Sequence, residues 1–144
     1  MRRLRGEEGA TLVEFALCSA VLFMFLFGIF GFCGALFSYN FVSDAAHEAT
    51  RYALVRGSAC SGFSDCNITS AQLQTYVQNL GYPGIIPSNL TAVATWSGAN
   101  TPSNAPGNIV SVTVTYTYPL NIPFWPQSGT ILHLSSTSHM AISQ

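Results

Sequence analysis

The stretch GATLVEFALCSAVLFMFLFGIFGFCGALF, residues 9–37, decides the fold of this chain. From Phe15 to Phe37 it runs for 23 residues without a charge and with a single hydroxyl, that of Ser19. At about 1.5 Å of rise per residue, a helix of this length spans roughly 35 Å, which exceeds a hydrocarbon core of about 30 Å. We therefore expect a transmembrane helix over residues 10–37.

Two other interpretations of the apolar run fit less well. A core helix of a soluble domain normally keeps a polar face, and this segment has none. A secretory signal peptide has a shorter apolar region, of about 7 to 15 residues, followed by a small-residue cleavage site. Here the chain continues through Ser38, Tyr39 and Asn40, so we do not expect removal at that point.

The distribution of basic residues predicts an orientation. Arg2, Arg3 and Arg5 precede the span, and the first basic residues after it are Arg51 and Arg56. The positive-inside rule therefore places the N-terminus in the cytoplasm and exports everything that follows the span.

The helical pattern continues beyond the membrane. Residues 38–56 contain neither proline nor glycine, and apolar side chains such as Phe41, Ala45 and Ala49 recur at helical spacing. Gly57 is placed to end this helix as a C-cap. The sequence therefore predicts one continuous helix from residue 11 to residue 56, approaching 70 Å at about 1.5 Å per residue, with residues 38–57 as an amphipathic extension.

A short second helix follows. Thr69 and Gln72 have the spacing of a capping box, and the apolar residues after them form one stripe. We expect a helix over residues 70–80, ended by Gly81.

Three strands are predicted after this helix. Apolar side chains recur at every second position in residues 90–96 and, most cleanly, in residues 109–118, where Ser and Thr alternate with them; residues 131–142 resume the pattern. Pro119 is expected to end the second strand, and residues 121–128 are expected to form a rigid apolar connector. Close spacing along the chain favours an antiparallel meander, and three strands alone are marginal without helices to cover them.

The predicted fold class is therefore α+β. A long N-terminal transmembrane helix continues as an amphipathic helix and packs, together with the short helix, on a small antiparallel β-sheet. The expected organisation is a segment of residues 1–9 before the span, the transmembrane helix of residues 10–37, the extension of residues 38–57 and an exported β-rich domain of residues 58–144.

Charge is scarce in this chain. Lysine is absent, no Asp, Glu, Lys or Arg follows Asp65, and the formal net charge is −1. A protein without a basic patch cannot neutralise phosphates, so nucleic acid is not an expected partner. The uncharged tract is rich in aromatic and β-branched residues, which argues against disorder and favours packing against partner proteins.

The four cysteines divide into two in the apolar run, Cys18 and Cys33, and two in a Gly/Ser-rich loop, Cys60 and Cys66. In an exported, oxidising compartment, a disulfide between Cys60 and Cys66 is the natural interpretation, with free thiols as the alternative. A zinc site would need two more ligands, and the available residues, His133 and His139, are far away in the sequence. We therefore expect no metal.

No pattern of catalytic residues is present. The sequence contains no Ser-His-acid set, paired catalytic carboxylates, Gly-rich phosphate loop or HExxH motif. We expect neither enzymatic activity nor a cofactor, which leaves a membrane-tethered enzyme as the weakest functional hypothesis.

Glu14 is the unusual residue of the span. A charged side chain costs about 2.5–3.5 kcal/mol at the centre of a membrane helix and less near its end. One interpretation is that Glu14 extends to the interface and has no role. In another, a peptidase cuts after Gly9, so that in a staggered bundle the Glu14 carboxylate of one chain neutralises the new Ala10 amine of its neighbour.

The stretch RGEEGATLVEFAL, residues 5–17, resembles the class III signal of type IV pilin-like proteins. The Glu14-Phe15 pair and the continuation AAHEATRYA, residues 45–53, resemble the TadE-like pseudopilins of tight-adherence (Tad/Flp) pilus systems. The resemblance is strong over residues 5–57 and only architectural beyond them. It implies that residues 1–9 form a leader peptide, that a prepilin peptidase cuts between Gly9 and Ala10, and that Glu14 and Phe15 act in assembly.

Two features qualify this assignment. A cut after Gly6 would compete, but it would put Thr11 at the fifth position of the mature chain, so Gly9 is preferred. Glu7 and Glu8 depart from the basic flank of classical type IV pilins, which bears on cleavage efficiency and not on topology.

The resemblance implies a minor pilin or pseudopilin that takes part in assembling or initiating an adhesive pilus at the bacterial inner membrane. Its implied partners are the lipid bilayer, the prepilin peptidase, other pilin and pseudopilin subunits and the inner-membrane assembly platform. The alternative is a single-pass anchored binding or adhesion module outside any pilus, which leaves Glu14 without a use.

Overall fold

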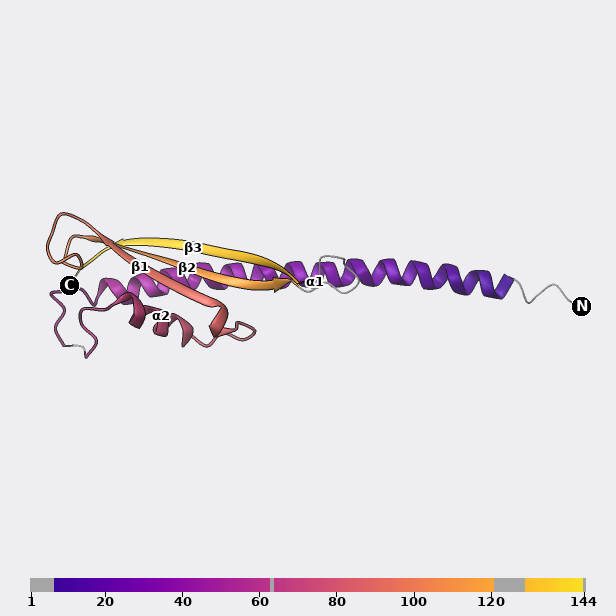
Figure 1. Ribbon diagram of the computed structural model, residues 1–144, viewed down its shortest axis with the longest axis horizontal. Coiled ribbons are helices and arrows are strands. Elements are labelled where there is room, and N and C mark those ends of the chain that lie inside the picture. Colours follow the sequence, from indigo (N-terminus) through magenta and orange to yellow (C-terminus); the bar gives the residue numbers. More distant parts are fainter. Residues whose placement is uncertain (1–6, 63, 121–128, 144) are drawn as a thin grey trace, which may run out of the picture. The chain divides into compact units, whose positions relative to one another are not determined.

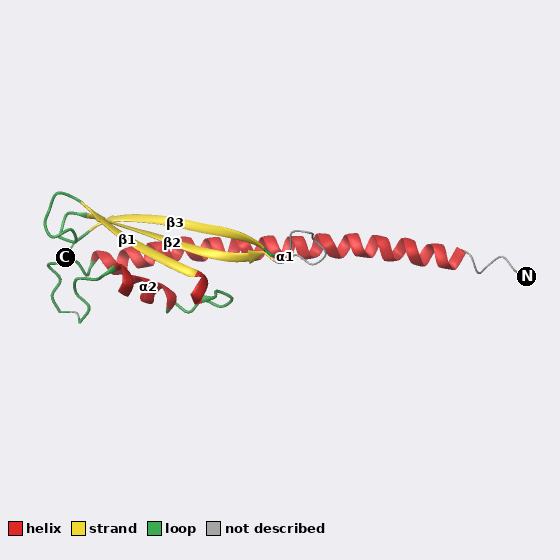
Figure 2. Ribbon diagram, viewed as in Figure 1, coloured by secondary structure: helices red, strands yellow, loops and turns green. Residues whose placement is uncertain are grey.

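The computed structural model of the protein describes residues 7–62, 64–120 and 129–143. Its elements follow the order α1 (Glu7–Leu54), α2 (Ser70–Gln78), the 3-10 turn η1 (Pro87–Asn89), β1 (Leu90–Ser97), β2 (Ile109–Leu120) and β3 (Thr130–Ala141). Figures 1 and 2 show the long helix α1, the shorter helix α2 and the small sheet. The predicted α+β class is therefore confirmed.

The chain divides into two compact units. The smaller unit comprises Met1–Ala35 with Pro119–Thr130, and the larger unit comprises Leu36–Tyr118 with Ile131–Gln144. The arginines before the span and the predicted connector of residues 121–128 lie outside the described residues.

Helix α1 is a single element of 48 residues, as the uninterrupted pattern predicted. It ends at Leu54, two residues earlier than expected, so the assignment of Gly57 as its C-cap was wrong. The chain leaves the helix because Arg56 N–H bonds back to Ala53 O (3.1 Å) while Arg56 O accepts from Ile68 N–H (3.2 Å). This return contact draws the backbone away from the helix axis before residue 57.

Helix α2 begins with the predicted capping box. Thr69 is the N-cap: its hydroxyl accepts from Gln72 N–H (3.4 Å), and its own N–H donates to Gln72 Oε1 (2.9 Å). The helix ends at Gln78 with Asn79 as C-cap, two residues short of the predicted end. Gly81 lies beyond it with φ of +68°, a left-handed conformation that favours glycine.

The sheet has the order β1-β2-β3, so neighbouring strands are also consecutive in the chain. β1 and β2 pair antiparallel, from Leu90 opposite Tyr116 to Ser97 opposite Ile109. The arrows of β2 and β3 also point in opposite directions in Figure 1. The predicted antiparallel meander is therefore confirmed.

Strand β2 extends through Pro119 to Leu120, so the prediction that Pro119 ends it was wrong. β1 pairs with β2 only as far as Tyr116. Beyond Tyr116, the described part of β2 is no longer paired with β1. Proline has no N–H to donate, so it is tolerated on a strand edge that is unpaired. The bond from Gly129 N–H to Leu120 O (3.2 Å) continues the pairing on the β3 side.

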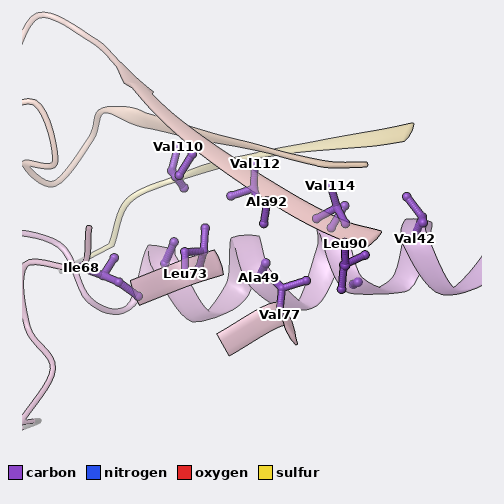
Figure 3. Close-up of a cluster of buried hydrophobic side chains, with 14 of the residues drawn as sticks. Val42, Ala49, Ile68, Leu73, Val77, Leu90, Ala92, Val110, Val112 and Val114 are labelled. Atoms are coloured by element: carbon purple, nitrogen blue, oxygen red, sulfur yellow. The ribbon is translucent and has the colours of Figure 1, made fainter. Parts of the chain in front are cut away.

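The core of the larger unit lies between one face of the sheet and the two helices (Figure 3). Small side chains of α1, such as Ala46 and Ala49, are fully buried and let the sheet approach the helix closely. Alternate residues of the strands face them, and Leu73 and Val77 of α2 complete the cluster. Fully burying a valine or leucine contributes about 1.5–3 kcal/mol, so this face holds the unit together.

Side chains of α2 occupy the free edge of β1. The Ser70 hydroxyl accepts from Ala94 N–H (3.1 Å). Gln74 accepts from Ala92 N–H (2.9 Å) and donates to Leu90 O (3.2 Å). These bonds satisfy backbone groups that an edge strand would otherwise present to another chain.

The loop between β1 and β2 is organised by Asn108, which is 1% exposed. Its Oδ1 accepts from Asn100 N–H (3.1 Å), and its Nδ2 donates to Asn100 O (2.8 Å) and Ser103 O (2.9 Å). A Cβ added at Gly98 would collide with the Asn108 side chain, so this position needs glycine for a close approach.

Candidate assembly site

The first part of α1 presents a bare apolar surface. Leu12, Phe15, Phe25 and Phe30 are each 69–75% exposed. By length and composition, α1 is the one helix among the described residues that could cross a membrane. Contiguous apolar surface of this extent requires lipid or other helices to cover it.

The predicted site residues lie together in the first three turns of this helix. Gly9, Ala10, Glu14 and Phe15 are all exposed. Ala10 and Glu14 are four residues apart and therefore lie on adjacent turns of the same helix face. Within the described part of the chain, no other side chain bonds to the Glu14 carboxylate, whereas the nearby Ser19 hydroxyl donates to Ala16 O (3.0 Å).

Gly9 has no packing role in the described structure. A Cβ built at this position would meet nothing within 4 Å. Gly9 and Ala10 are both exposed near the start of the described part of α1.

The cysteines fall into the two groups expected from their positions. The structure joins Cys60 to Cys66 by a disulfide, while Cys18 and Cys33 are free and exposed on α1. The disulfide loop is attached to the rest of the larger unit at its start, because Ser58 N–H donates to Asn104 O (3.0 Å).

A second group of polar residues was not identified from the sequence. Asp44, His47, Glu48 and Arg51 are exposed on α1, and the ring of His47 is hydrogen-bonded to Ser138 of β3 (Nδ1–Oγ 3.1 Å). They line a groove of about 510 Å³ whose other wall is formed by Leu80 and Tyr82. The signal that could have revealed them is the clustering of charge in a region otherwise almost free of it.

An aromatic stack supports one acid of this groove. The rings of Tyr52 and Tyr76 are stacked with centroids 3.9 Å apart, and the Arg56 guanidinium lies 3.6 Å from the Tyr52 centroid. The Tyr76 hydroxyl donates to Glu48 Oε1 (3.3 Å). Burial, reinforced by the nearby Glu48 carboxylate, raises the pKa of Tyr76 above its usual value, so the phenol remains protonated and able to donate.

The remaining candidate ligands are dispersed. His133 and His139 are exposed on β3, on the face of the sheet away from the core. Across residues 7–62, 64–120 and 129–143, no three His, Cys, Asp or Glu side chains gather in a way that could hold a metal ion.

Comparison with known proteins yields one finding, and it falls on α1. Residues 9–51 match the family model described as TadE-like protein. The comparisons with curated proteins and with solved structures found no match. The matched segment begins at Gly9 and includes Glu14, the exposed apolar surface and the charged face that ends at Arg51. From residue 9 to residue 51, the helix that carries Glu14 is therefore similar to the corresponding segment of TadE-like proteins.

Proposed function

We propose that this protein is a minor pilin, or pseudopilin, that takes part in assembling or initiating a tight-adherence pilus in the bacterial inner membrane. The observation that carries the proposal is an exposed carboxylate, Glu14, near the start of a bare apolar helix whose sequence is TadE-like. The arginines before the span favour a cytoplasmic N-terminus and an extracytoplasmic sheet domain.

The proposal gives Glu14 a partner. An isolated carboxylate in a membrane helix is costly, and no described side chain neutralises it. If the prepilin peptidase cuts after Gly9, Ala10 becomes a free ammonium at the start of the same helix. With neighbouring helices staggered by about four residues, or roughly 6 Å, the carboxylate of one subunit lies beside the ammonium of the next.

The surroundings of Gly9 support cleavage at that bond. Glycine is not required there by packing within this chain, because a Cβ would have free space. Recognition of a glycine before the cleaved bond by the peptidase would explain why glycine is present at position 9. Phe15, 75% exposed beside Glu14, then offers an apolar contact to the neighbouring helix.

Mass spectrometry of the protein from its native membrane tests the cleavage. We expect a mature N-terminus at Ala10 in cells with an active prepilin peptidase, and an intact Met1 terminus when the peptidase gene is deleted. An intact N-terminus in both strains would contradict the proposal and favour a plain membrane-anchored binding module.

Substitution of Glu14 tests the assembly role. We expect Glu14→Ala to enter the membrane normally but to lower pilus number by about tenfold or more, since about 1.4 kcal/mol per lost contact changes an equilibrium tenfold. Thr11→Ala is the matched control, because Thr11 would be the fifth residue after a cut at Gly6. Normal pili with Glu14→Ala, or loss with Thr11→Ala alone, would count against the assignment.

A further inference from the structure

Most of the charge in the larger unit lies on one stripe of α1. Asp44, Glu48 and Arg51 are exposed, and from residue 36 to residue 144 the other charged residues are Arg56 and Asp65. We call Asp44, Glu48 and Arg51 the charged stripe. Positions 44, 48 and 51 follow the i, i+4, i+7 spacing of one helix face, so the three side chains project in the same direction.

The stripe lies in a groove and not on a flat surface. Leu80 and Tyr82 border the groove of about 510 Å³ into which the charged side chains project. Tyr82 is held in place by Phe41, with ring centroids 4.6 Å apart, and Glu48 by the Tyr76 hydroxyl at 3.3 Å. The groove is therefore built from side chains with defined positions.

The order of charges along the stripe determines how two parallel copies can meet. In register, each acid would face the same acid, and like charges would repel. Displacing one copy along the helix axis by three residues brings Arg51 beside Glu48, and displacing it by seven brings Arg51 beside Asp44. At about 1.5 Å per residue, these displacements are roughly 5–10 Å.

We propose that the charged stripe is a contact between neighbouring copies of this chain, packed in parallel with an axial stagger of three residues, or about 5 Å. In this contact, Arg51 of one copy pairs with Glu48 of the next. The inference rests on the proposed function, because anchoring in the same membrane is what makes neighbouring helices parallel. A second copy is the occupant because the stripe complements itself once staggered, while residues 66–144 carry no charge that could serve instead.

Disulfide cross-linking in native membranes measures the stagger. Phe37 and Asn40 are exposed, uncharged and on the same helix face as the stripe. In a background of Cys18→Ala and Cys33→Ala, one tagged copy carries Phe37→Cys and a differently tagged copy carries Asn40→Cys. We expect the mixed 37–40 cross-link to exceed the 40–40 cross-link several-fold, because disulfides form only between Cα atoms about 4.4–6.8 Å apart.

Charge reversal then tests the pairing. Glu48→Arg alone and Arg51→Glu alone each place like charges in the contact, and we expect each to lower the mixed cross-link about threefold to tenfold. When one copy carries Glu48→Arg and the other carries Arg51→Glu, residues 48 and 51 of neighbouring copies again have opposite charges. The yield of the mixed cross-link should then return. Thr91→Arg, exposed on the opposite face of the sheet, is the matched control and should change nothing.

The mixed-copy experiment separates pairing between chains from pairing within one helix, since Glu48 and Arg51 are also three residues apart in the same chain. Recovery only when both reversals are in one chain would overturn the inference. So would cross-linking that peaks at 40–40, unchanged yield in the single variants, or cross-links to a different subunit in place of a second copy. Formation of the Cys60–Cys66 disulfide, followed by gel mobility with and without reductant, shows that each variant folds.

Failure here is distinguishable from failure of the proposed function. The N-terminal mass is measured on the same membranes. A processed N-terminus and an assembly defect in Glu14→Ala, together with charge reversals that have no effect, would remove this inference alone. An intact N-terminus with the staggered cross-link present would remove the proposed processing and leave the contact standing.

Discussion

Asn108 makes several of the side-chain hydrogen bonds that hold the long loop between β1 and β2. Its buried side chain bonds to the backbone of Asn100, Pro102 and Ser103. A buried amide that satisfies several backbone groups is costly to remove, because those groups then lack partners away from water.

We expect Asn108→Ala to lower the free energy of unfolding by about 1–3 kcal/mol, since it leaves buried N–H and C=O groups unpaired. Asn100→Ala is the matched control: its exposed side chain makes one bond, to Pro106 O (2.8 Å), so its loss should be smaller. Thermal unfolding of the detergent-solubilised proteins measures both. Equal stability of the two variants would show that the loop does not rely on Asn108.

At the scale of the elements, α2 covers the core and also bonds to the free edge of strand β1. One side of the helix buries Leu73 and Val77, and Ser70, Gln74 and Gln78 bond to the backbone of β1. An uncharged edge strand without such bonds would be a template for pairing with another chain.

Replacing Gln74 by leucine should open this edge. The change removes the partner of Ala92 N–H, and we expect a loss of about 1–2 kcal/mol in the free energy of unfolding together with more aggregation. Gln78→Leu is the control, because Leu90 O keeps its bond from Gln74 when Gln78 is lost. Size-exclusion chromatography and thermal unfolding in detergent provide the comparison, and indistinguishable behaviour of the two variants would contradict the assigned role.

At the scale of the whole molecule, the two units differ in the environment that their surfaces require. The smaller unit exposes aromatic and aliphatic side chains along α1, whereas the larger unit has a buried apolar core between helices and sheet. The thiols report this difference directly, because two are free on the apolar surface of α1 and two form the disulfide of the larger unit.

We expect a membrane-impermeant maleimide, applied to spheroplasts, to label no cysteine before reduction and two, Cys60 and Cys66, after it. Cys18 and Cys33 should react only after the membrane is dissolved in a denaturing detergent, because lipid excludes the reagent from them. Mass spectrometry counts the modified residues. Labelling of Cys33 in intact membranes, or protection of reduced Cys60 and Cys66 from the outside, would contradict the topology.

The sequence by itself determined the elements whose cause is local. An uncharged run of 23 residues made α1 recognisable, strict alternation from Val110 to Tyr118 assigned both faces of β2, and the spacing of Thr69 and Gln72 located the start of α2. Each of these follows from hydrogen bonds or side-chain directions that repeat within a few residues.

Tertiary structure decided the features that depend on residues far apart in the chain. The end of α1 is set by the contact of Arg56 with Ile68. Strand β2 continues through Pro119 because its pairing with β1 ends at Tyr116. The groove beside the charged stripe exists because the chain brings Tyr82 back to α1. The physical reason is that these outcomes depend on which backbone and side-chain groups packing brings together, and no local periodicity carries that information.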